Sequence, residues 1–301
     1  MAKSFRLGTR GSKLAMVQAK STALRLEALH PGLRVELVVI STQGDRSTEM
    51  PLSAGEGMGL FTKEIQNLLL KDHVDGAVHS LKDLPTQTVN GLVMAGVSER
   101  ADWRDAWLCP SGHSLIELPA GSKVGTGSPR RQAQIKRIRP DLQCVEFRGN
   151  VDTRLAKLDQ GVVAAAVLAA AGLSRLGLSG RVSSFFDEYQ MLPAPGQGFL
   201  AYECREKDAS SVALLKSLDH PHARACSDAE RAFLERLGAG CHAPVGALGR
   251  SAGHRLHLMG FTQNKDGRVF SAEAEGTDGA AIALGKSLAE KLLAEGAEMT
   301  R

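Results

Sequence analysis

The stretch VVAAAVLAAAG at residues 162–172 is apolar throughout. At this length it cannot span a membrane, which takes about 20 apolar residues in a helix. A short, continuous apolar run is typical of a strand buried on both faces, as in a parallel sheet. The stretch therefore predicts a fully buried strand of a parallel sheet.

Strands and amphipathic helices alternate upstream of this run. The strand expected at 122–128 leads into a helix that starts at Pro129, with Ser128 as its N-cap. The strand expected at 144–150 leads into a helix capped by Asn150. The first hundred residues repeat the order, with strands expected at 4–10, 34–42 and 75–81, a helix at 59–71, and another after Ser12 with Leu14, Val17, Leu24 and Leu29 on one face. This alternation predicts mostly parallel sheets with helices on their faces.

The last eighty residues or so have a different pattern of predicted secondary structure. A helix near 222–237 precedes segments that alternate like antiparallel strands, joined by turns such as KDG. An amphipathic helix at 278–296 closes the chain. The pattern predicts a small α+β domain. Before it, LPAPGQG at 192–198 has the composition of a crossing segment and precedes one more strand, at 199–205.

The composition limits the class of protein. The 301 residues carry 37 basic and 33 acidic side chains, a net charge of +4, and few aromatic side chains, which argues against nucleic-acid binding. No apolar run reaches the length of a membrane span, and the start of the chain has no apolar signal core, so we expect a cytoplasmic protein with no membrane partner. The five cysteines form no C-x-x-C pair and are expected to be mostly free thiols.

One cluster contains metal-binding residue types. His220, His222 and Cys226 lie together in DHPHARAC, but their spacing fits none of the usual zinc patterns. We interpret the stretch as the start of a helix with incidental histidines, and we expect no metal.

Arginines recur where predicted strands end. Arg130 and Arg131 follow Ser128 at a helix start, where free backbone N–H groups and bidentate guanidinium groups attract anions. A solvated basic turn is the alternative interpretation. Further arginines lie at or soon after strand ends at Arg10, Arg148, Arg154 and Arg175. Open α/β sheets bind ligands at this edge, so the set suggests a ligand with many carboxylates or phosphates.

Two other segments carry reactive side chains. In VHSLKDLP, Ser80, Lys82 and Asp83 follow a predicted strand, and Asp83 either stabilises a developing cation or caps a turn. In GAGCHAPVG, Cys241 lies among small residues beside His242. A metal ligand, a disulfide half, a nucleophile and a plain loop cysteine are all possible roles for Cys241.

Nine segments together resemble the porphobilinogen deaminase (hydroxymethylbilane synthase) family of tetrapyrrole biosynthesis. They follow the family's order and spacing over essentially the whole chain: LGTRGSKLA, GLFTKEI, AVHSLKDLP, VGTGSPRRQAQ, FRGNVDTRL, LAAAGLSRLGL, LPAPGQG, ECR and GAGCHAPVG. One such motif is weak evidence, whereas nine in order are highly specific.

The resemblance implies an α/β fold of three domains. Domain 1 would span 1–98 and a return segment 199–216, and domain 2 would span 103–192. These two would be similar to the lobes of periplasmic binding proteins, with the active cleft between them. Domain 3, a small α+β domain at 221–301, would carry the cofactor cysteine. Since the family is usually monomeric, we expect a monomer.

The resemblance also implies a transferase that condenses four porphobilinogen molecules head to tail. Cys241 would be bonded through a thioether to a dipyrromethane, made by the enzyme from its own substrate. Each addition would lose ammonia and form a cationic azafulvene-like species, which the terminal ring attacks. Water would then release hydroxymethylbilane, and the dipyrromethane would stay attached.

Residue roles follow from position in the family's motifs. Asp83 would be the catalytic carboxylate, which stabilises positive charge on the ring under attack. Contacts to the cofactor would come from Ser80, Lys82, Ser128, Arg130 and Arg131. Contacts to the substrate would come from Arg10, Ser12, Arg148, Arg154 and Arg175. Each ring carries an acetate and a propionate, so the growing chain is a polyanion that needs many cations.

The chain departs from the family in the loop LSAGEGMGLF at 52–61. Relatives commonly carry two lysines where this chain has Ala54 and Met58, so carboxylates should bind more weakly there or to other groups. His242 stands where relatives often have other polar residues, and it receives no role.

Two alternatives stay open on the sequence. One is a two-lobed binding protein without catalysis, in which Cys241 has no purpose. The other is a thiol enzyme that uses Cys241 with His242, although the base for such a thiol normally comes from elsewhere in the fold.

Overall fold

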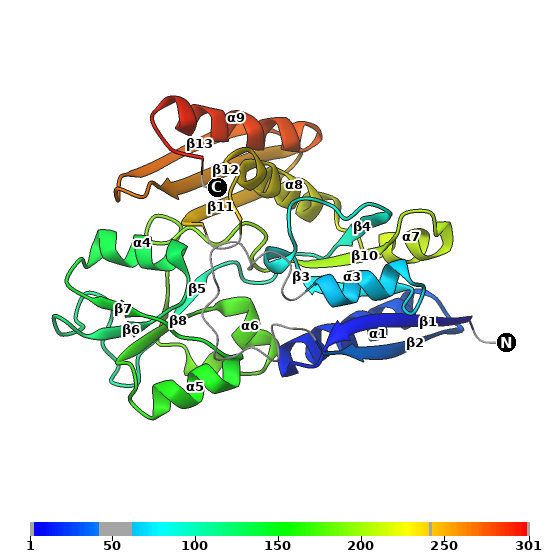
Figure 1. The fold of residues 1–301 in the computed structure, drawn as a ribbon, viewed down its shortest axis with the longest axis horizontal. Helices are drawn as coiled ribbons and strands as arrows, with labels where there is room; N and C mark the ends of the chain where they lie inside the picture. The colour runs from blue at the N-terminus through cyan, green and yellow to red at the C-terminus, as the bar shows by residue number, and fades with distance from the viewer. Residues whose placement is uncertain (1–2, 42–61, 241–242, 300–301) are drawn as a thin grey trace.

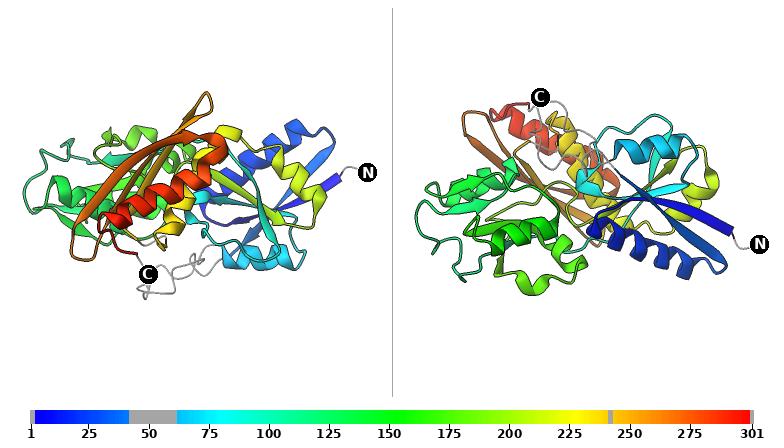
Figure 2. Two further views of the ribbon diagram at one scale, coloured as in Figure 1. Left: turned by 90° about the horizontal axis from the view of Figure 1, so that it is seen from above. Right: turned by 60° about the horizontal axis from the view of Figure 1, so that its bottom comes forward.

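The structure, a computed structural model, describes residues 3–41, 62–240 and 243–299. Within these ranges the strands form two five-stranded sheets and one three-stranded sheet. The two larger sheets and their helices lie side by side, and the three-stranded sheet with its two helices lies against both (Figures 1 and 2). The α/β class predicted from the sequence, with a small α+β unit at the C-terminus, is confirmed.

Lobe 1 is built on the sheet with strand order β2-β1-β3-β10-β4. Its strands are β1 (Lys3–Arg10), β2 (Leu33–Ile40), β3 (Gly76–Ser80), β4 (Leu92–Val97) and β10 (Leu200–Arg205). Strand β1 is parallel to β2 and β3, whereas β10 lies between β3 and β4 and runs antiparallel to both. The helices that pack on this sheet are α1 (Lys13–Leu29), α3 (Lys63–Leu70) and α7 (Ala209–Lys216).

Lobe 2 is built on the sheet with strand order β7-β6-β8-β5-β9. Its strands are β5 (Asp105–Leu108), β6 (Lys123–Gly125), β7 (Gln143–Val145), β8 (Ala165–Ala169) and β9 (Ser184–Phe185). Strand β6 is parallel to β7 and β8, and β5 is antiparallel to β8 and β9. The helices of this lobe are α4 (Pro129–Ile138), α5 (Val151–Asp159) and α6 (Ala170–Arg175), and a 3₁₀ turn η2 (Ser179–Arg181) follows.

The strand predicted at 162–172 is shorter in the structure. Only Ala165–Ala169 are extended, as β8, and the chain turns into helix α6 at Ala170. Residues Ala165 and Val167 are buried, as the prediction requires, but Val162 is exposed. Alanine has the highest helix propensity, and an apolar run of alanine and valine contains no signal that marks where the sheet stops.

The apolar face predicted for α1 is wrong. Ser12 does cap the helix, since the Ala15 N–H donates to Ser12 Oγ at 3.3 Å. However, the helix buries Gln18, Ala19, Thr22, Ala23 and Leu26, while Val17, Leu24 and Leu29 are exposed. The buried polar groups are satisfied: the Gln18 side-chain amide donates to Ser80 Oγ at 3.0 Å, and Thr22 Oγ1 donates to the Gln18 carbonyl at 2.9 Å. Hydrogen bonding thus permits burial of polar side chains that periodicity alone assigns to solvent.

The C-terminal unit comprises α8 (Pro221–Arg236), an antiparallel sheet and α9 (Ala281–Ala294). Its strands are β11 (Val245–Ala252), β12 (Arg255–Gln263) and β13 (Val269–Thr277), and a 3₁₀ turn η3 (Asp278–Ala280) precedes α9. Helix α8 packs on α9, and at Gly285 an added Cβ would clash with the Ala229 carbonyl oxygen. The predicted helix–strands–helix pattern is confirmed.

Glu230 of α8 joins the C-terminal unit to the segments that connect the lobes. Its side chain is fully buried and accepts hydrogen bonds from Arg100 Nη1 at 2.7 Å, the Gly196 N–H at 2.7 Å and the Gly249 N–H at 2.8 Å. Arg100 lies between β4 and β5, and Gly196 lies between β9 and β10. One carboxylate therefore holds both connections between the lobes and the first strand of the C-terminal sheet.

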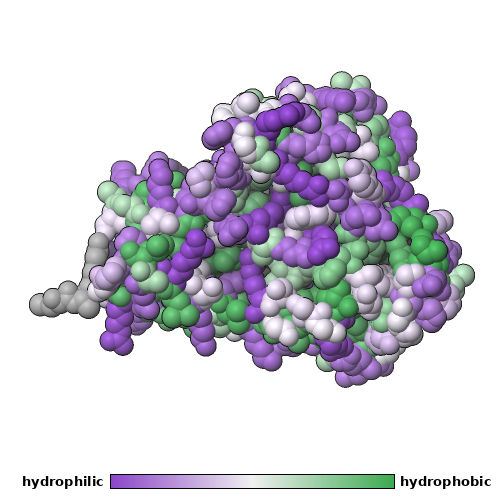
Figure 3. Space-filling model, turned by 180° about the vertical axis from the view of Figure 1, so that it is seen from behind, coloured by the Kyte–Doolittle hydropathy of each residue, from purple (hydrophilic) through white to green (hydrophobic). Residues whose placement is uncertain are grey.

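The surface seen from behind mixes hydrophilic and hydrophobic side chains, and the hydrophobic ones form separate small patches on this face (Figure 3). Within the described ranges, no helix combines the length and the apolar character needed to cross a membrane.

Candidate active site

The topology of lobe 1 brings its predicted site residues to one edge of the sheet. Strands β1 and β3 are parallel neighbours, so Arg10 and Ser80, the last residue of each strand, lie at the same edge. The 3₁₀ turn η1 (Leu81–Asp83) follows β3 at once and carries Lys82 and Asp83. Ser12 lies just beyond Arg10 as the cap of α1.

The antiparallel strands start where the parallel strands end. In lobe 1, Leu200 at the start of β10 pairs with Ser80 at the end of β3. In lobe 2, Asp105 at the start of β5 pairs with Ala169 at the end of β8. The two segments that connect the lobes therefore arrive at the edges where the parallel strands of both sheets end.

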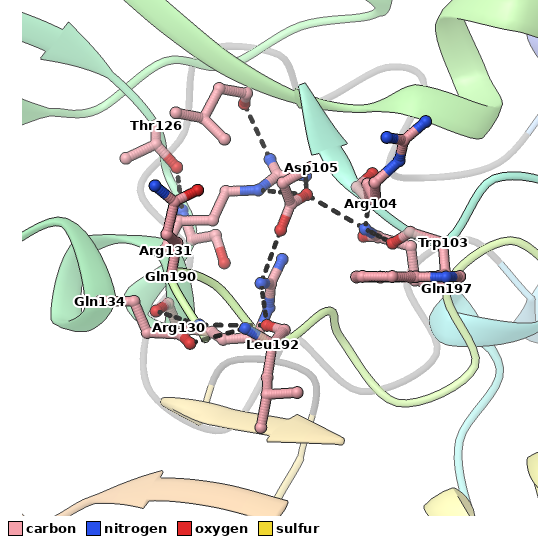
Figure 4. Close-up of polar contacts among 12 residues, drawn as sticks. Trp103, Arg104, Asp105, Thr126, Arg130, Arg131, Gln134, Gln190, Leu192 and Gln197 are labelled. Carbon is pink, nitrogen blue, oxygen red and sulfur yellow. Dashed lines mark hydrogen bonds and ion pairs between the residues drawn. The ribbon is translucent and has the colours of Figure 1, made fainter. Parts of the chain in front are cut away.

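Asp105 lies at the centre of the polar groups in lobe 2 (Figure 4). Its carboxylate is fully buried and accepts from Arg130 Nη1 at 2.7 Å and from Arg131 Nη2 at 2.7 Å. Gln197 Nε2 donates to the same carboxylate at 3.1 Å from the other side. Burial disfavours the charge, but attraction from Arg130 and Arg131 outweighs burial and holds the pKa of Asp105 far below its usual range.

Arg130 and Arg131 are buried rather than solvated, so the basic-turn interpretation of this segment is wrong. Arg130 Nη1 also donates to the Leu192 carbonyl at 2.6 Å, and Arg131 Nη1 donates to the Val167 carbonyl at 2.9 Å. The Arg130 Nε atom is buried and has no hydrogen-bond partner among the described residues. Ser128 caps α4 as predicted, although its hydroxyl makes no capping hydrogen bond.

Gln197 connects this group of lobe 2 to the predicted site of lobe 1. Its Oε1 accepts from Lys82 Nζ at 3.4 Å, while its Nε2 also donates to the Trp103 carbonyl at 2.8 Å. Burial lowers the pKa of Lys82 to about 8, with a smaller opposing attraction from Asp83. Lys82 is therefore a cation that can lose its proton near neutral pH.

Arg154 of α5 faces the same region. Burial, followed by repulsion from Arg131, lowers its pKa to about 10, whereas the negative charge of Asp83 opposes the change. The buried Nε of Arg154 has no hydrogen-bond partner within the described ranges. Since Asp83 belongs to lobe 1 and Arg154 to lobe 2, these charges act on each other between the lobes.

The remaining predicted arginines have protein partners. Arg148 Nε donates to Glu146 Oε1 at 2.6 Å in a half-exposed ion pair. Arg175 Nη2 donates to the Gly198 carbonyl at 2.8 Å, and burial lowers the pKa of Arg175. Arg175 therefore ties α6 of lobe 2 to the segment that leads back to lobe 1.

Several predicted residues lie outside the described residues: Ala54, Met58, Cys241 and His242. Cys109, Cys144, Cys204 and Cys226 are free thiols, as expected for the cysteines in the described ranges. Burial raises the pKa of Cys226 to about 12, so its thiol is protonated at neutral pH.

The histidine-rich stretch is a helix start, as interpreted from the sequence. His220 is the N-cap of α8, and its Nδ1 accepts from the Ala223 N–H at 3.3 Å. His222 Nδ1 lies 2.9 Å from Asp278 Oδ2. Among the described residues, no group of three or more His, Cys, Asp or Glu side chains is arranged to hold a metal ion.

Asp105 was not predicted from the sequence, and Gln197 was predicted only as part of the crossing segment 192–198. Asp105 opens the otherwise apolar run DAWL, and a charged residue at the start of a buried strand is the signal that pointed to it. Gln197 lies in LPAPGQG between two glycines with positive φ, and there an added Cβ at Gly198 would lie 2.7 Å from the Ala101 carbonyl oxygen.

Two family models match the chain. The model described as "Porphobilinogen deaminase, dipyromethane cofactor binding domain" matches residues 5–213. The model described as "Porphobilinogen deaminase, C-terminal domain" matches residues 224–294.

Curated relatives match over nearly the full length. The porphobilinogen deaminase of Xanthomonas euvesicatoria pv. vesicatoria (strain 85-10) is 46% identical over 295 residues, which cover 98% of this chain and 97% of that protein. That of Acidothermus cellulolyticus is 47% identical over 299 residues, which cover 98% of this chain and 90% of that protein. Among solved structures, the methionine binding protein MetQ aligns with a TM-score of 0.47 and 18% identity, over 71% of this chain and 89% of that chain.

Proposed function

The chain belongs to the porphobilinogen deaminase family, and on this premise we propose roles for its individual residues. As a member it is a transferase of tetrapyrrole biosynthesis. It condenses four porphobilinogen molecules on a dipyrromethane cofactor with loss of ammonia, and it releases hydroxymethylbilane by hydrolysis. The alternative of a binding protein without catalysis is therefore not retained.

The described residues fit a cofactor that carries several carboxylates. Two arginines hold a buried Nε atom without a hydrogen-bond partner among the described residues, Arg130 in α4 and Arg154 in α5. A buried guanidinium donor without a partner is costly, and an incoming carboxylate would satisfy it. When bound, the cofactor supplies the terminal pyrrole to which each new unit is joined.

We assign the covalent anchor to Cys241, four residues beyond the C-cap Leu237 of α8. The buried thiol of Cys226, on the same helix, is a poor alternative because burial keeps it protonated. Lys82, Arg130 and Arg131 would hold cofactor carboxylates, and Ser80 and Ser128 would donate their hydroxyl groups. Support for this comes from their position at the facing edges of the two sheets.

Substrate carboxylates would be bound by a second set at the same edges: Arg10, Ser12, Arg148, Arg154 and Arg175. The hydroxyl of Ser12 also caps α1, so its loss would affect the helix as well as binding. Arg148 and Arg175 already make hydrogen bonds to protein groups, which orient their guanidinium planes before substrate arrives.

Asp83 would stabilise positive charge on the substrate ring after ammonia leaves. The observation that carries this assignment is its place at the end of β3, next to Lys82 and within electrostatic reach of Arg154 of the other lobe. Burial lowers the pKa of both cations, and the negative charge of Asp83 opposes that shift. A carboxylate at this place can offset, by electrostatic attraction, a cation that develops on the ring.

We further propose a cytoplasmic monomer with three domains, at 1–98 with 199–216, at 103–192 and at 221–301. The strands of each sheet fall within one of these sets of residues, which supports the boundaries.

Two variants test the residue roles. Asp83→Asn removes the charge and should lower kcat by about 10²–10³-fold. Cys241→Ser should leave the intact protein at the mass of its sequence, while wild type purified from a host that makes porphobilinogen should be heavier by two pyrrole units. Asp141→Asn, at an exposed carboxylate that pairs with Arg139, is the matched control and should change neither kcat nor the adduct mass. A wild-type kcat in Asp83→Asn, or an adduct on Cys241→Ser, would contradict the corresponding assignment.

A further inference from the structure

The turn that carries Asp83 is supported from outside its own lobe. Leu81 and Leu84 are buried, with 1% and 6% of their surface exposed. Both belong to the core cluster that contains Ala229 and Phe233 of α8. The turn η1 is therefore packed on the C-terminal unit as well as attached to β3.

Arg231 of α8 holds the backbone immediately after Asp83. Its Nη1 donates to the carbonyl oxygen of Leu84 at 3.0 Å. Its Nη2 donates to the carbonyl oxygens of Pro85 at 2.7 Å and Thr86 at 3.3 Å. One guanidinium group thus fixes three consecutive peptide carbonyls, and its planar fork allows what a lysine ammonium could do only in part.

The carboxylate of Asp83 has no comparable support of its own. Within the described ranges no hydrogen bond or ion pair joins it to another group, and its charge acts on Lys82 and Arg154 electrostatically. Its direction is therefore set by the backbone of η1 and of residues 84–86. That backbone is what Arg231 holds.

We propose that Arg231 is a positioning residue for the transferase reaction, which acts by fixing the backbone that orients Asp83. The proposal rests on the role assigned to Asp83 above. Helix α8 ends at Arg236, five residues before Cys241 in the chain. The same helix therefore supports the backbone beside the proposed catalytic carboxylate and, in the sequence, precedes the proposed cofactor anchor.

The test is a double-mutant cycle between Arg231 and Asp83 in the full-length holoenzyme. Arg231→Ala should lower kcat by about 10- to 100-fold, because a small misplacement of a catalytic group has effects of this size. KM should change by less than about twofold, since the arginines proposed to bind substrate keep their contacts. In the Asp83→Asn background, Arg231→Ala should lower kcat by less than about twofold, because there is no longer a carboxylate to orient.

Arg231→Lys and Arg236→Ala are the accompanying variants. Arg231→Lys retains a cation and should recover part of kcat. Arg236 lies on the same helix in a partly exposed ion pair with Glu290, so Arg236→Ala should leave kcat at the wild-type value. Thermal melting and intact mass establish that each variant is folded and carries its cofactor.

The outcomes separate the two assignments. An equal fold-loss of kcat in both backgrounds would overturn the positioning role, as would a loss in Arg236→Ala that matches that of Arg231→Ala. A wild-type kcat in Arg231→Ala would also overturn it. A wild-type kcat in Asp83→Asn alone would instead contradict the role of Asp83.

Discussion

Gln197 Nε2 donates to Asp105 Oδ1 at 3.1 Å, so the segment that returns from lobe 2 to lobe 1 is tied to the carboxylate between Arg130 and Arg131. The opposite end of the same amide accepts from Lys82. A single neutral side chain therefore sets the spacing between cations that belong to different lobes.

Gln197→Leu removes this spacer without a large change in volume. We expect KM for porphobilinogen to rise by about 3- to 10-fold, because hydrogen bonds worth about 0.5–1.5 kcal/mol each no longer orient Lys82 and Asp105. Steady-state kinetics measure the change. Gln190→Leu, at an exposed glutamine of the same connection, should leave KM unaltered, and an equal rise there would refute the argument.

Glu230→Ala should destabilise the protein strongly. The change leaves the N–H groups of Gly196 and Gly249 without an acceptor and removes the carboxylate that pairs with Arg100, so the free energy of unfolding should fall by about 3–5 kcal/mol. Urea unfolding gives the value. Glu290→Ala removes an exposed carboxylate and should cost less than about 1 kcal/mol. Similar losses in the two variants would show that burial of Glu230 is not what matters.

Gly285→Ala tests the contact between α8 and α9. The added methyl group would meet the Ala229 carbonyl oxygen, so the helices must separate, and the free energy of unfolding should fall by about 1–3 kcal/mol. Differential scanning calorimetry should show a lower Tm. Gly279→Ala is the control, because no atom lies within 4 Å of its added Cβ. An unchanged Tm in Gly285→Ala would mean that the helices adjust freely.

Because of Lys82, the free energy of unfolding should rise with pH, whereas an ion-paired lysine would make it fall as pH rises. Its pKa of about 8 lies below the ordinary value of 10.5 because burial disfavours the charge. Below pH 8 the folded state holds a buried charged ammonium group, and the full free-energy cost of burying that charge lowers its stability. Between about pH 8 and 10.5 the unfolded chain binds more protons than the folded state, so the free energy of unfolding rises with pH.

Lys82→Met should therefore be more stable than wild type at pH 7, by about 2–3 kcal/mol, and the difference should vanish by about pH 10.5. A Cys241→Ser background keeps the comparison free of the anchored cofactor. Urea unfolding at pH 7 and at pH 10.5 measures the difference in the free energy of unfolding. Lys71→Met, at an exposed lysine, is the control. A constant difference across this range would argue against a lowered pKa.

Met58→Lys addresses the departure from the family in the loop 52–61. Because a lysine there would introduce a cation that attracts substrate carboxylates, we expect turnover to continue and KM to fall. Initial rates at low and high salt measure this, since the gain should shrink as salt screens the charge. A raised KM would count against an anion-binding role at this position.

The sequence predicted the elements that depend on local pattern. Arg10, Ser80 and Arg130 end or follow strands in a β–α alternation, and the rule that ligands bind at strand ends placed them correctly at sheet edges. It did not predict that β10 inserts between β3 and β4, or that Asp105 neutralises Arg130 and Arg131. Both depend on contacts between residues that are far apart in the chain, and the periodicity of the sequence carries no information about such contacts.

Burial of polar residues accounts for the other differences. Gln18 and Thr22 lie inside because they hydrogen-bond to Ser80 and to the helix itself, whereas the pattern of leucines and valines favoured the opposite face of α1. Glu230 is hidden in a helix whose sequence, with charges throughout, resembles a solvated surface. In each case the available hydrogen-bond partner, and not the residue type, decides whether the side chain is buried.

The insertion of β10 fixes the order in which the sheets can be completed on the ribosome. All strands of the lobe 2 sheet lie between residues 105 and 185, so that sheet has its full set once this segment has emerged. The lobe 1 sheet, although its first strand is made at the start, lacks the strand that joins β3 to β4 until residue 205 is translated. The nascent chain must therefore carry two unjoined parts of lobe 1 while the second lobe matures.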